Sequence, residues 1–197
     1  MDSSIQIIEK PDWVSWDDIH DVIWRAHENN RKRGVSLKHA AYSGEEIKDY
    51  LSPDGKMFVA LCDGEVIGTA AYKKKTASFW FGESFFAYCC FAAVLPQHLG
   101  KGVYGQLVKA RELSALSEGI DKMLFNTHPD NCEVIQISQR HGYKKVNYMG
   151  SKEAPWVFLV KWLNGCPYSD FKIDFMYAKA NVVTKTKLII KKLLKRG

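Results

Sequence analysis

The sequence predicts an α/β protein of the α+β kind, in which a mixed, mostly antiparallel central sheet is flanked by helices on both faces. Two apolar runs joined by Asp63-Gly64 indicate a β-hairpin. Two Ser-x-x-acid patterns, at Ser15 and Ser43, precede residues with helical periodicity. The nearly all-apolar residues 85–94 are typical of a central strand covered on both faces. With 46% hydrophobic and 25% charged residues, the 197-residue chain can build a packed core.

Residues 5–8 alternate in polarity, which predicts a strand as the first element of the chain. After Ser15, apolar residues recur at i, i+3, i+4 and i+7, which predicts a helix. Residues 29–38 are polar and basic and predict a loop. The helix capped by Ser43 ends at Pro53-Asp54-Gly55.

The remaining elements follow from apolar runs, helical spacing and glycine stops. We predict strands at 57–62, 65–72, 79–81 and 85–94, a helix at 103–116, a strand at 123–125, a helix at 132–140, and strands at 147–148 and 156–163.

The chain is predicted to form one domain over residues 1–166, followed by a C-terminal extension, 167–197, that holds a basic amphipathic helix. The net charge of +6 belongs to this extension, because residues 179–197 carry seven basic and no acidic residues. The rest holds 21 basic and 22 acidic residues, which argues against a nucleic-acid-binding domain. The helix can lie on an anionic membrane or pack on protein, and we favour packing.

The N-terminus has no cationic segment followed by an apolar one, and the longest uncharged apolar run, residues 84–97, is shorter than the roughly 20 residues that span a bilayer. The five cysteines are odd in number and lack Cys-x-x-Cys spacing. We therefore expect reduced, mostly buried thiols, no metal site and a cytoplasmic protein, with membrane-peripheral placement through the tail as the alternative.

A glycine-rich turn follows the strand that ends at Val94. Its glycines, Gly100, Gly102 and Gly105, let an anion approach the backbone N–H groups, and the dipole of the following helix adds positive potential. Lys101 is not followed by Ser or Thr, so this is not a Walker loop. The spacing also departs from the dinucleotide fingerprint. A turn without a ligand is the alternative interpretation.

The pattern Val94-x-Pro96-x-x-x-Gly100-Lys101-Gly102 resembles the central motif of the GNAT superfamily of acyl-CoA N-acyltransferases. Further on, Asn131, a helix and the pair Gly142-Tyr143 extend the resemblance, and the element order matches from Ile5 to about Leu163.

This resemblance implies acetyl-CoA as the acyl donor. Pantetheine would pair with a strand end, the pyrophosphate would bind N–H groups of the turn, and Asn131 would hold pantetheine or the next helix. A backbone N–H near Val94 would stabilise the oxyanion. The implied cofactor-binding residues are Ala92, Ala93, Val94, Leu99, Gly100, Lys101, Gly102, Val103, Tyr104, Gly105 and Asn131. Leu99 and Tyr104 depart from the residues that many members carry.

The acid and base of the reaction are less clearly marked. The family's tyrosine acid corresponds here to Ser138, a poor proton donor, and its glutamate bases to Tyr88 and Asn126. Glu83 and His128 are the substitute candidates for the base, with a water chain as an alternative.

The predicted reaction is N-acetylation of a primary amine on a small acceptor by direct attack on the thioester. Cations and aromatics near the first two helices suit an amino sugar or a nucleotide-linked amino sugar. These residues are Trp13, Trp16, Trp24, Arg31, Lys32, Arg33, Lys38, His39 and Tyr42. Since the usual acid and base are missing, a non-catalytic CoA-binding or interaction module on the same fold is the alternative. The oligomeric state stays open.

Overall fold

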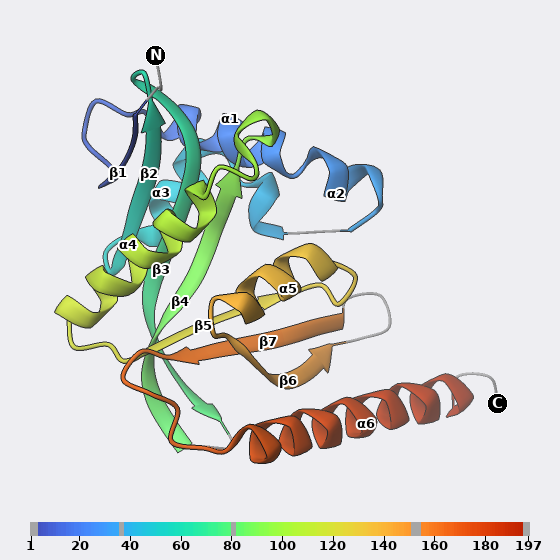
Figure 1. Ribbon diagram of the computed structural model, residues 1–197. Coiled ribbons are helices and arrows are strands. Elements are labelled where there is room, and N and C mark those ends of the chain that lie inside the picture. Colours follow the sequence, from blue (N-terminus) through green and yellow to red (C-terminus); the bar gives the residue numbers. More distant parts are fainter. Residues whose placement is uncertain (1–3, 36–37, 80–81, 151–154, 195–197) are drawn as a thin grey trace. The chain divides into compact units, whose positions relative to one another are not determined.

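The computed structural model describes residues 4–35, 38–79, 82–150 and 155–194 (Figure 1). By their internal contacts, the residues group into two compact units, 1–123 and 124–197. The strand that joins them, β5 (Lys122–Thr127), begins two residues before the boundary.

The first unit is built on four strands that pair in sequence order, each antiparallel to the next. They are β1 (Ile5–Glu9), β2 (Gly55–Cys62), β3 (Glu65–Phe79) and β4 (Gly82–Val94). The predicted hairpin is confirmed, with Asp63 and Gly64 at φ 52° and 85° in the turn between β2 and β3.

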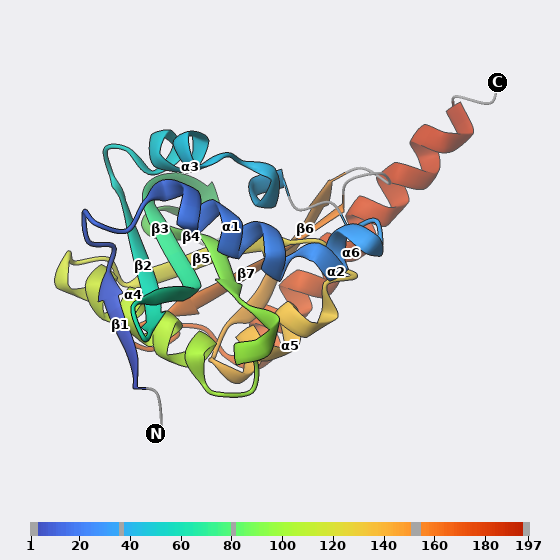
Figure 2. The ribbon, with the colours of Figure 1, turned by 90° about the horizontal axis from the view of Figure 1, so that it is seen from above.

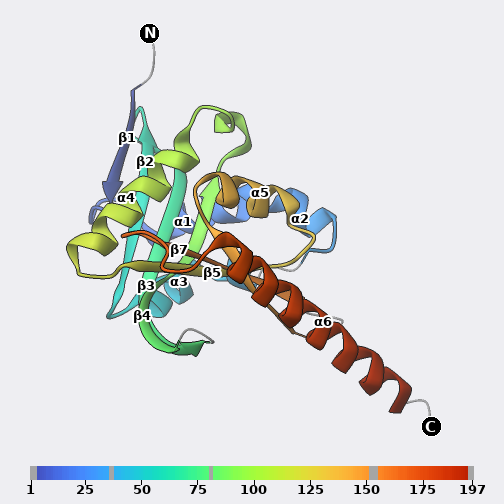
Figure 3. The same cartoon turned by 60° about the horizontal axis from the view of Figure 1, so that its bottom comes forward.

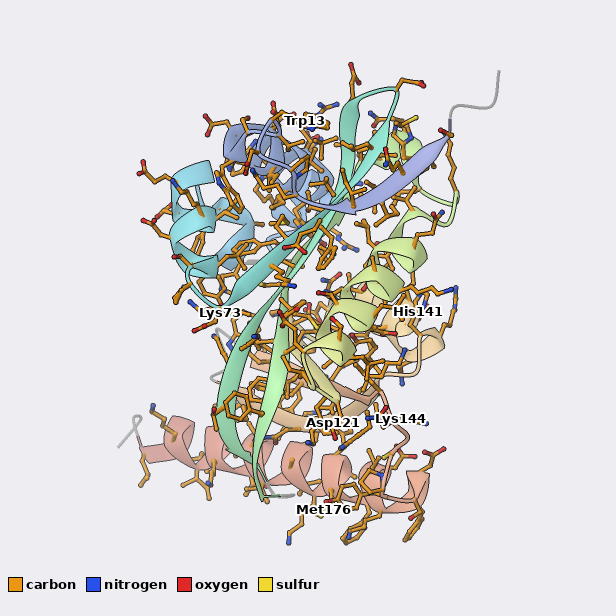
Figure 4. The ribbon with its side chains drawn as sticks, turned by 90° about the vertical axis from the view of Figure 1, so that its left-hand side faces the viewer. Trp13, Lys73, Asp121, His141, Lys144 and Met176 are labelled. Carbon is orange, nitrogen blue, oxygen red and sulfur yellow. The ribbon has the colours of Figure 1, made fainter. Side chains whose placement is uncertain are left out.

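Strand β3 is longer than predicted, because it continues through a run of three lysines to Phe79. Pairing with β4 gives this stretch a ladder partner at almost every residue, which outweighs the low strand preference of lysine. Lys73, labelled in Figure 4, also donates from Nζ to the Tyr50 and Ser52 carbonyls at 2.7 and 2.9 Å.

Helices cover both faces of these strands. The helices α1 (Trp16–Ala26) and α3 (Gly44–Leu51) lie on one face, and α4 (Val103–Ser117) lies on the other (Figure 2). Both predicted capping boxes are present: Ser15 Oγ accepts from Asp18 N at 3.0 Å and Ser43 Oγ from Glu46 N at 3.2 Å. Buried side chains of α1, α3, β2 and β4 form the core, among them Ile19, Ile23, Ile47, Val59 and Phe91.

The stretch predicted as a loop, residues 29–38, is partly helical. It contains most of α2 (Glu28–Lys32) and leads into a 3₁₀ turn, η1 (Lys38–Ala41). The Glu28–Lys32 ion pair at 2.8 Å, one helical turn apart, and the buried Asn30 explain why polar residues are helical here.

In the second unit the strands follow the order β5, β7 (Pro155–Trp162), β6 (Lys144–Gly150), and β6 is antiparallel to β7. It also contains α5 (Cys132–Arg140) and one long helix, α6 (Asp170–Leu194), shown in Figure 3. In α6, Ile173 is fully buried and Thr184 Oγ1 donates to the Tyr148 carbonyl at 2.8 Å, so part of the extension packs on β6, as we favoured. Among the described residues, no helix is both long and apolar enough to cross a bilayer.

The predicted fold class, mixed α/β with mostly antiparallel strands and flanking helices, is confirmed. The domain limits at residues 166 and 167 stay a prediction. The contact grouping joins the extension to residues 124–166. Cys89 and Cys90 are buried, but Cys132 and Cys166 are exposed. The prediction that most of the cysteines are buried is therefore only partly confirmed.

Candidate active site

Strand β4 carries a bulge close to its end. Thr69 pairs with Ala93 and Ala71 with Cys90, so Phe91 and Ala92 together oppose one residue of β3. Phe91 has φ 50°, and its carbonyl accepts a 2.7 Å hydrogen bond from the buried Thr69 Oγ1. A bulge re-aims the backbone groups beside it, and pairing with β3 resumes after it at Ala93 and Val94.

The turn after β4 holds two glycines in the left-handed region. A 3₁₀ turn, η2 (Pro96–His98), comes first, and then Gly100 and Gly102 have φ 77° and 75°. Such values are strained for residues with a Cβ and are available to glycine without cost. A Cβ built on either glycine would meet nothing within 4 Å, so the space beside them is open.

The N-terminus of α4 is uncapped by any side chain. Gly102 is its N-cap residue and has no side chain to bond the first N–H groups, whereas α1 and α3 both close theirs with serine. Gln106 N donates to Gly102 O at 3.1 Å, as the helix pattern requires, which leaves the amides before it outside the helical ladder. Among the described residues, the amides of Gly100, Lys101 and Gly102 donate no backbone hydrogen bond.

Leu99 differs from the rest of the predicted phosphate-binding set. Its N–H donates to the Pro96 carbonyl at 3.2 Å, which closes the 3₁₀ turn. This amide is therefore already used within the described part of the chain, unlike those of Gly100, Lys101 and Gly102.

A cavity of about 280 Å³ opens between α1, α2 and the following turn. Its lining residues are His27, Asn30, Arg31, Gly34, Val35, Ala40 and Ala41. His27 ends α1, takes a 3.2 Å contact from Asn30 Nδ2 on Nδ1, and hydrogen-bonds the backbone of Ala92 in the β4 bulge. This wall of the cavity is therefore tied directly to the strand end.

His27 is kept neutral by its surroundings. Burial lowers its pKa below the ordinary 6.5, the bond to Ala92 opposes this, and the charge of Arg31 lowers it further. The sequence does not mark His27 as a site residue. Its one local signal is its position after the last apolar residue of a predicted helix, which does not indicate contact with a distant strand.

The basic residues predicted to bind the acceptor separate into two groups. Arg31 lines the cavity, stacks on Trp24 with the guanidinium carbon 3.6 Å from the ring centre, and donates to the Trp24 carbonyl at 2.6 Å. Lys32 pairs with Glu28 at 2.8 Å on the helix surface, and Arg33 binds Asn30 Oδ1 at 2.8 Å. Arg31 is thus the cation of this set that faces the cavity, and the side chain of Lys38 is outside the described part.

Aromatic side chains gather around the bulged Phe91. The His39 ring centre lies 4.8 Å from that of Tyr50, 5.2 Å from Tyr42 and 5.4 Å from Phe91. Lys75 Nζ lies 4.4 Å from the centre of the Tyr88 ring. Burial raises the pKa of both Tyr50 and Tyr88, so these phenols stay protonated near neutral pH.

The second unit carries three of the predicted site residues. His128 follows β5 and accepts from Asp130 N on Nδ1 at 3.2 Å. Asn131, the N-cap of α5, is buried and donates from Nδ2 to Thr127 Oγ1 at 3.0 Å. Ser138 is buried in α5, and its hydroxyl has no hydrogen-bond partner among the described residues.

Glu83 lies at the mouth of the central strand, where the sequence interpretation put it. It pairs with Ser78 at the beginning of β4, eight residues before Phe91. At the usual rise per residue these positions are about 26 Å apart. The role of Glu83 as the base stays a prediction, and its distance from the bulge does not support that role.

Comparison with known proteins decides the family. The acetyltransferase (GNAT) family model matches residues 16–143, which is more than half of the chain and includes the bulge, the glycine turn and Asn131. The chain belongs to the GNAT acetyltransferase family. It is thus an acetyltransferase, and coenzyme A carries the group that the family transfers.

Solved GNAT structures share the fold at low sequence identity. An acetyltransferase of the GNAT family from Staphylococcus aureus Mu50 is 13% identical, with 81% of this chain and 99% of that chain covered and a TM-score of 0.64. The PaiA N-acetyltransferase from Thermoplasma acidophilum, solved with coenzyme A, is 18% identical over 81% and 99%, with a TM-score of 0.62. An aminoglycoside 6′-N-acetyltransferase complexed with coenzyme A is 13% identical over 83% and 99%, also at 0.62. Among curated proteins, no sequence match to this GNAT chain was found.

Proposed function

We propose that this GNAT acetyltransferase transfers an acetyl group from acetyl-CoA to the primary amine of a small anionic acceptor, an amino sugar or a nucleotide-linked amino sugar. The observation that carries the proposal is the uncapped start of α4 behind the bulged end of β4. Family membership supplies the reaction class, and the cavity at His27 and Arg31 supports the acceptor class.

The pyrophosphate of the donor would bind the N–H groups from Gly100 to Gly105. The turn fits this group, because Gly100 and Gly102 leave open space where other residues carry a Cβ, and α4 adds the positive end of its dipole. Lys101 would contribute a positive charge. Pantetheine would pair with the backbone of Ala92 to Val94, from the bulge to the end of the strand.

The acceptor would enter the cavity beside the bulge. With His27 neutral, Arg31 supplies the positive charge of the wall, and one of its five N–H donors is used by Trp24. The remaining donors suit a phosphate or carboxylate on the acceptor. Asn30 supplies a polar amide of the kind that binds sugar hydroxyls.

Transfer begins when the neutral amine attacks the thioester carbonyl and forms the C–N bond. A backbone N–H beside the bulge would stabilise the oxyanion, after which the C–S bond breaks. The amine proton passes to a base, and the departing thiolate takes up a proton. In the second unit, His128 stays our candidate base. Ser138, whose hydroxyl has no hydrogen-bond partner within the described residues, stays a candidate donor to sulfur.

Calorimetry with coenzyme A tests the donor site. Gly102→Ala puts a Cβ at φ 75° in the proposed phosphate turn, whereas Gly119→Ala puts one at φ 74° beyond the far end of α4, also in open space. The two changes cost similar backbone strain, about 1–2 kcal/mol. We expect at least tenfold weaker binding for Gly102→Ala alone. Equal affinities for the two variants would contradict the site.

Thiol release with a panel of amines tests the acceptor. Amino sugar phosphates and nucleotide-linked amino sugars should be turned over, and Arg31→Gln should raise their KM roughly tenfold, because a charge-assisted hydrogen bond is lost. Arg25→Gln, which removes an exposed arginine paired with Asp21 at 3.0 Å on the same helix, is the matched control. Turnover restricted to polyamines or peptide N-termini would reject the anionic acceptor.

A further inference from the structure

Helix α6 has two apolar faces, and its own unit uses one of them. The less exposed residues recur every three or four positions: Ile173, Met176, Tyr177, Ala180, Asn181, Thr184 and Leu188. This face contacts β6, since Thr184 bonds the Tyr148 carbonyl and Lys145 Nζ lies 5.0 Å from the Tyr177 ring centre. An ion pair of 3.0 Å between Asp170 and Lys144, which is labelled in Figure 4, holds the start of the helix.

The opposite face is apolar and exposed. It is formed by Phe171, Phe175, Val182, Ile189 and Leu193, spaced by four, seven, seven and four residues, which places them on one side of a helix. We call these five residues the outer stripe. They are 81%, 59%, 65%, 60% and 65% exposed, and the two phenylalanine rings stack at 6.5 Å. Exposed apolar side chains that gather on one side of a helix mark an interaction surface.

Positive charge flanks the outer stripe along most of its length. At 3.6 residues per turn, the exposed Lys172, Lys179 and Lys185 lie beside the stripe, whereas Lys187 and Lys191 lie on the opposite side of the helix. Acidic residues occur in α6 at Asp170 and Asp174, both in its first five residues, and Asp170 is paired with Lys144. From residue 175 on, the helix has no acidic residue, and Lys179 and Lys185 border the apolar stripe on its two sides.

We propose that the outer stripe of α6 docks on an anionic lipid bilayer, with the helix lying in the membrane interface while its inner face stays on β6. A helix with an apolar stripe and flanking lysines buries the stripe at the acyl boundary and pairs its cations with anionic headgroups. Charge complementarity favours a lipid surface over a second copy of the chain, because two copies would bring like-charged lysines together. The inference does not depend on the proposed acceptor.

Vesicle co-sedimentation of the full chain tests the docking. The protein should sediment with vesicles of phosphatidylcholine mixed with phosphatidylglycerol, and much less with phosphatidylcholine alone or at high salt. Leu193→Ser should lower partition by roughly tenfold, since one buried leucine is lost. Leu113→Ser, which changes a leucine 57% exposed on α4, is the matched control and should leave partition unchanged. Lys179→Gln and Lys185→Gln, which change lysines beside the stripe, should each weaken it about fivefold.

Three outcomes would overturn the proposal. The first is no sedimentation with the anionic vesicles, and the second is equal partition of Leu193→Ser and Leu113→Ser. The third is light scattering that shows a dimer which Leu193→Ser dissociates while vesicle binding persists, since a second copy would then cover the stripe. Circular dichroism of each variant checks that α6 stays helical.

Discussion

At the scale of single residues, His27 links the cavity to the strand that the donor would pair with. Its ring contacts Asn30 within α2 and the backbone of Ala92 in β4, and burial is the main cause of its lowered pKa. A neutral imidazole can hold both contacts, whereas an imidazolium would have no lone pair for a donor on Nδ1. The residue therefore makes the local structure sensitive to acid.

We predict that stability decreases as the pH falls below the unfolded-state pKa of His27, about 6.5. Because the folded-state pKa is lower, the unfolded chain binds more protons there, and the contribution of His27 is complete only above this pH. Urea unfolding at about pH 7.5 and 5.5 measures the effect. His27→Gln keeps polar contacts without titrating and should reduce the pH dependence, while His98→Gln is the control. An unchanged dependence in His27→Gln would exclude this role.

At the scale of elements, the β4 bulge depends on a bond from its neighbour β3. The Thr69 hydroxyl is fully buried and donates to Phe91 O, in the only two-against-one pairing that the register gives along the described β3–β4 ladder. A valine has the same shape but no donor, so it leaves the carbonyl of a left-handed residue unsupported.

We predict that Thr69→Val lowers the free energy of unfolding by about 1–3 kcal/mol, because a buried carbonyl loses its donor. Acetyl transfer should fall by a larger factor than donor affinity, since the proposed site has the bulge orient the backbone beside the thioester. Thr76→Val, at an exposed position of the same strand, should change neither quantity much. Equal stability of the two variants, measured by chemical denaturation, would show that the bulge does not depend on the hydrogen bond from Thr69.

The far end of α4 is fixed by a second polar cluster. Glu118 accepts from Tyr72 OH at 2.7 Å and pairs with Lys56 and Lys74 at 3.1 and 3.3 Å. Burial raises the pKa of Glu118, but the three hydrogen bonds together outweigh burial and bring the pKa below 4.5. The stabilisation is present above that pH and is lost as the pH falls through the folded-state pKa.

Glu118→Gln should therefore cost about 1–2 kcal/mol near neutral pH, since two charge-assisted contacts are lost. The free energy of unfolding of Glu118→Gln should also change less between neutral and acid pH than that of the parent chain. Thermal unfolding across pH measures both effects, with the exposed Glu45→Gln as the control. Parallel curves for the parent chain and Glu118→Gln would contradict the assignment.

Elements with strong local signals were predictable from sequence, and those set by tertiary pairing were not. The serine caps, the Asp-Gly hairpin and the glycine turn depend on neighbouring residues, and each was confirmed. The extension of β3 through three lysines depends on pairing with β4, which no local pattern reveals. The same applies to the cavity, since His27 meets Ala92 only after folding brings residues 65 positions apart together.

At the scale of the whole molecule, charge is distributed unevenly along the chain. Residues 179–197 hold seven basic residues without an acidic one, and the remainder is close to neutral. A polyanion should therefore bind to the positively charged residues 179–197, and not to the nearly neutral remainder of the chain, which carries the glycine turn.

We predict that replacing Lys185, Lys187 and Lys191 by glutamine removes most of the retention on heparin. As a matched control, Lys32, Lys48 and Lys109 are exposed lysines of the body, and their triple glutamine variant has the same net charge. It should elute at a salt concentration close to that of the parent chain. Equal losses in the two variants would mean that net charge, not its placement, governs binding to polyanions.

The missing cap of α4 also has a consequence for how coenzyme fragments should rank in a thermal-shift screen. With Gly102 as N-cap, the helix start lacks the internal bonds that Ser15 and Ser43 give to α1 and α3. In the proposed site a bound pyrophosphate would supply them, and any compound that binds only the folded chain raises its melting temperature. Adenosine diphosphate fragments that keep both phosphates should therefore protect the enzyme from heat more than pantetheine, although pantetheine carries the reactive end.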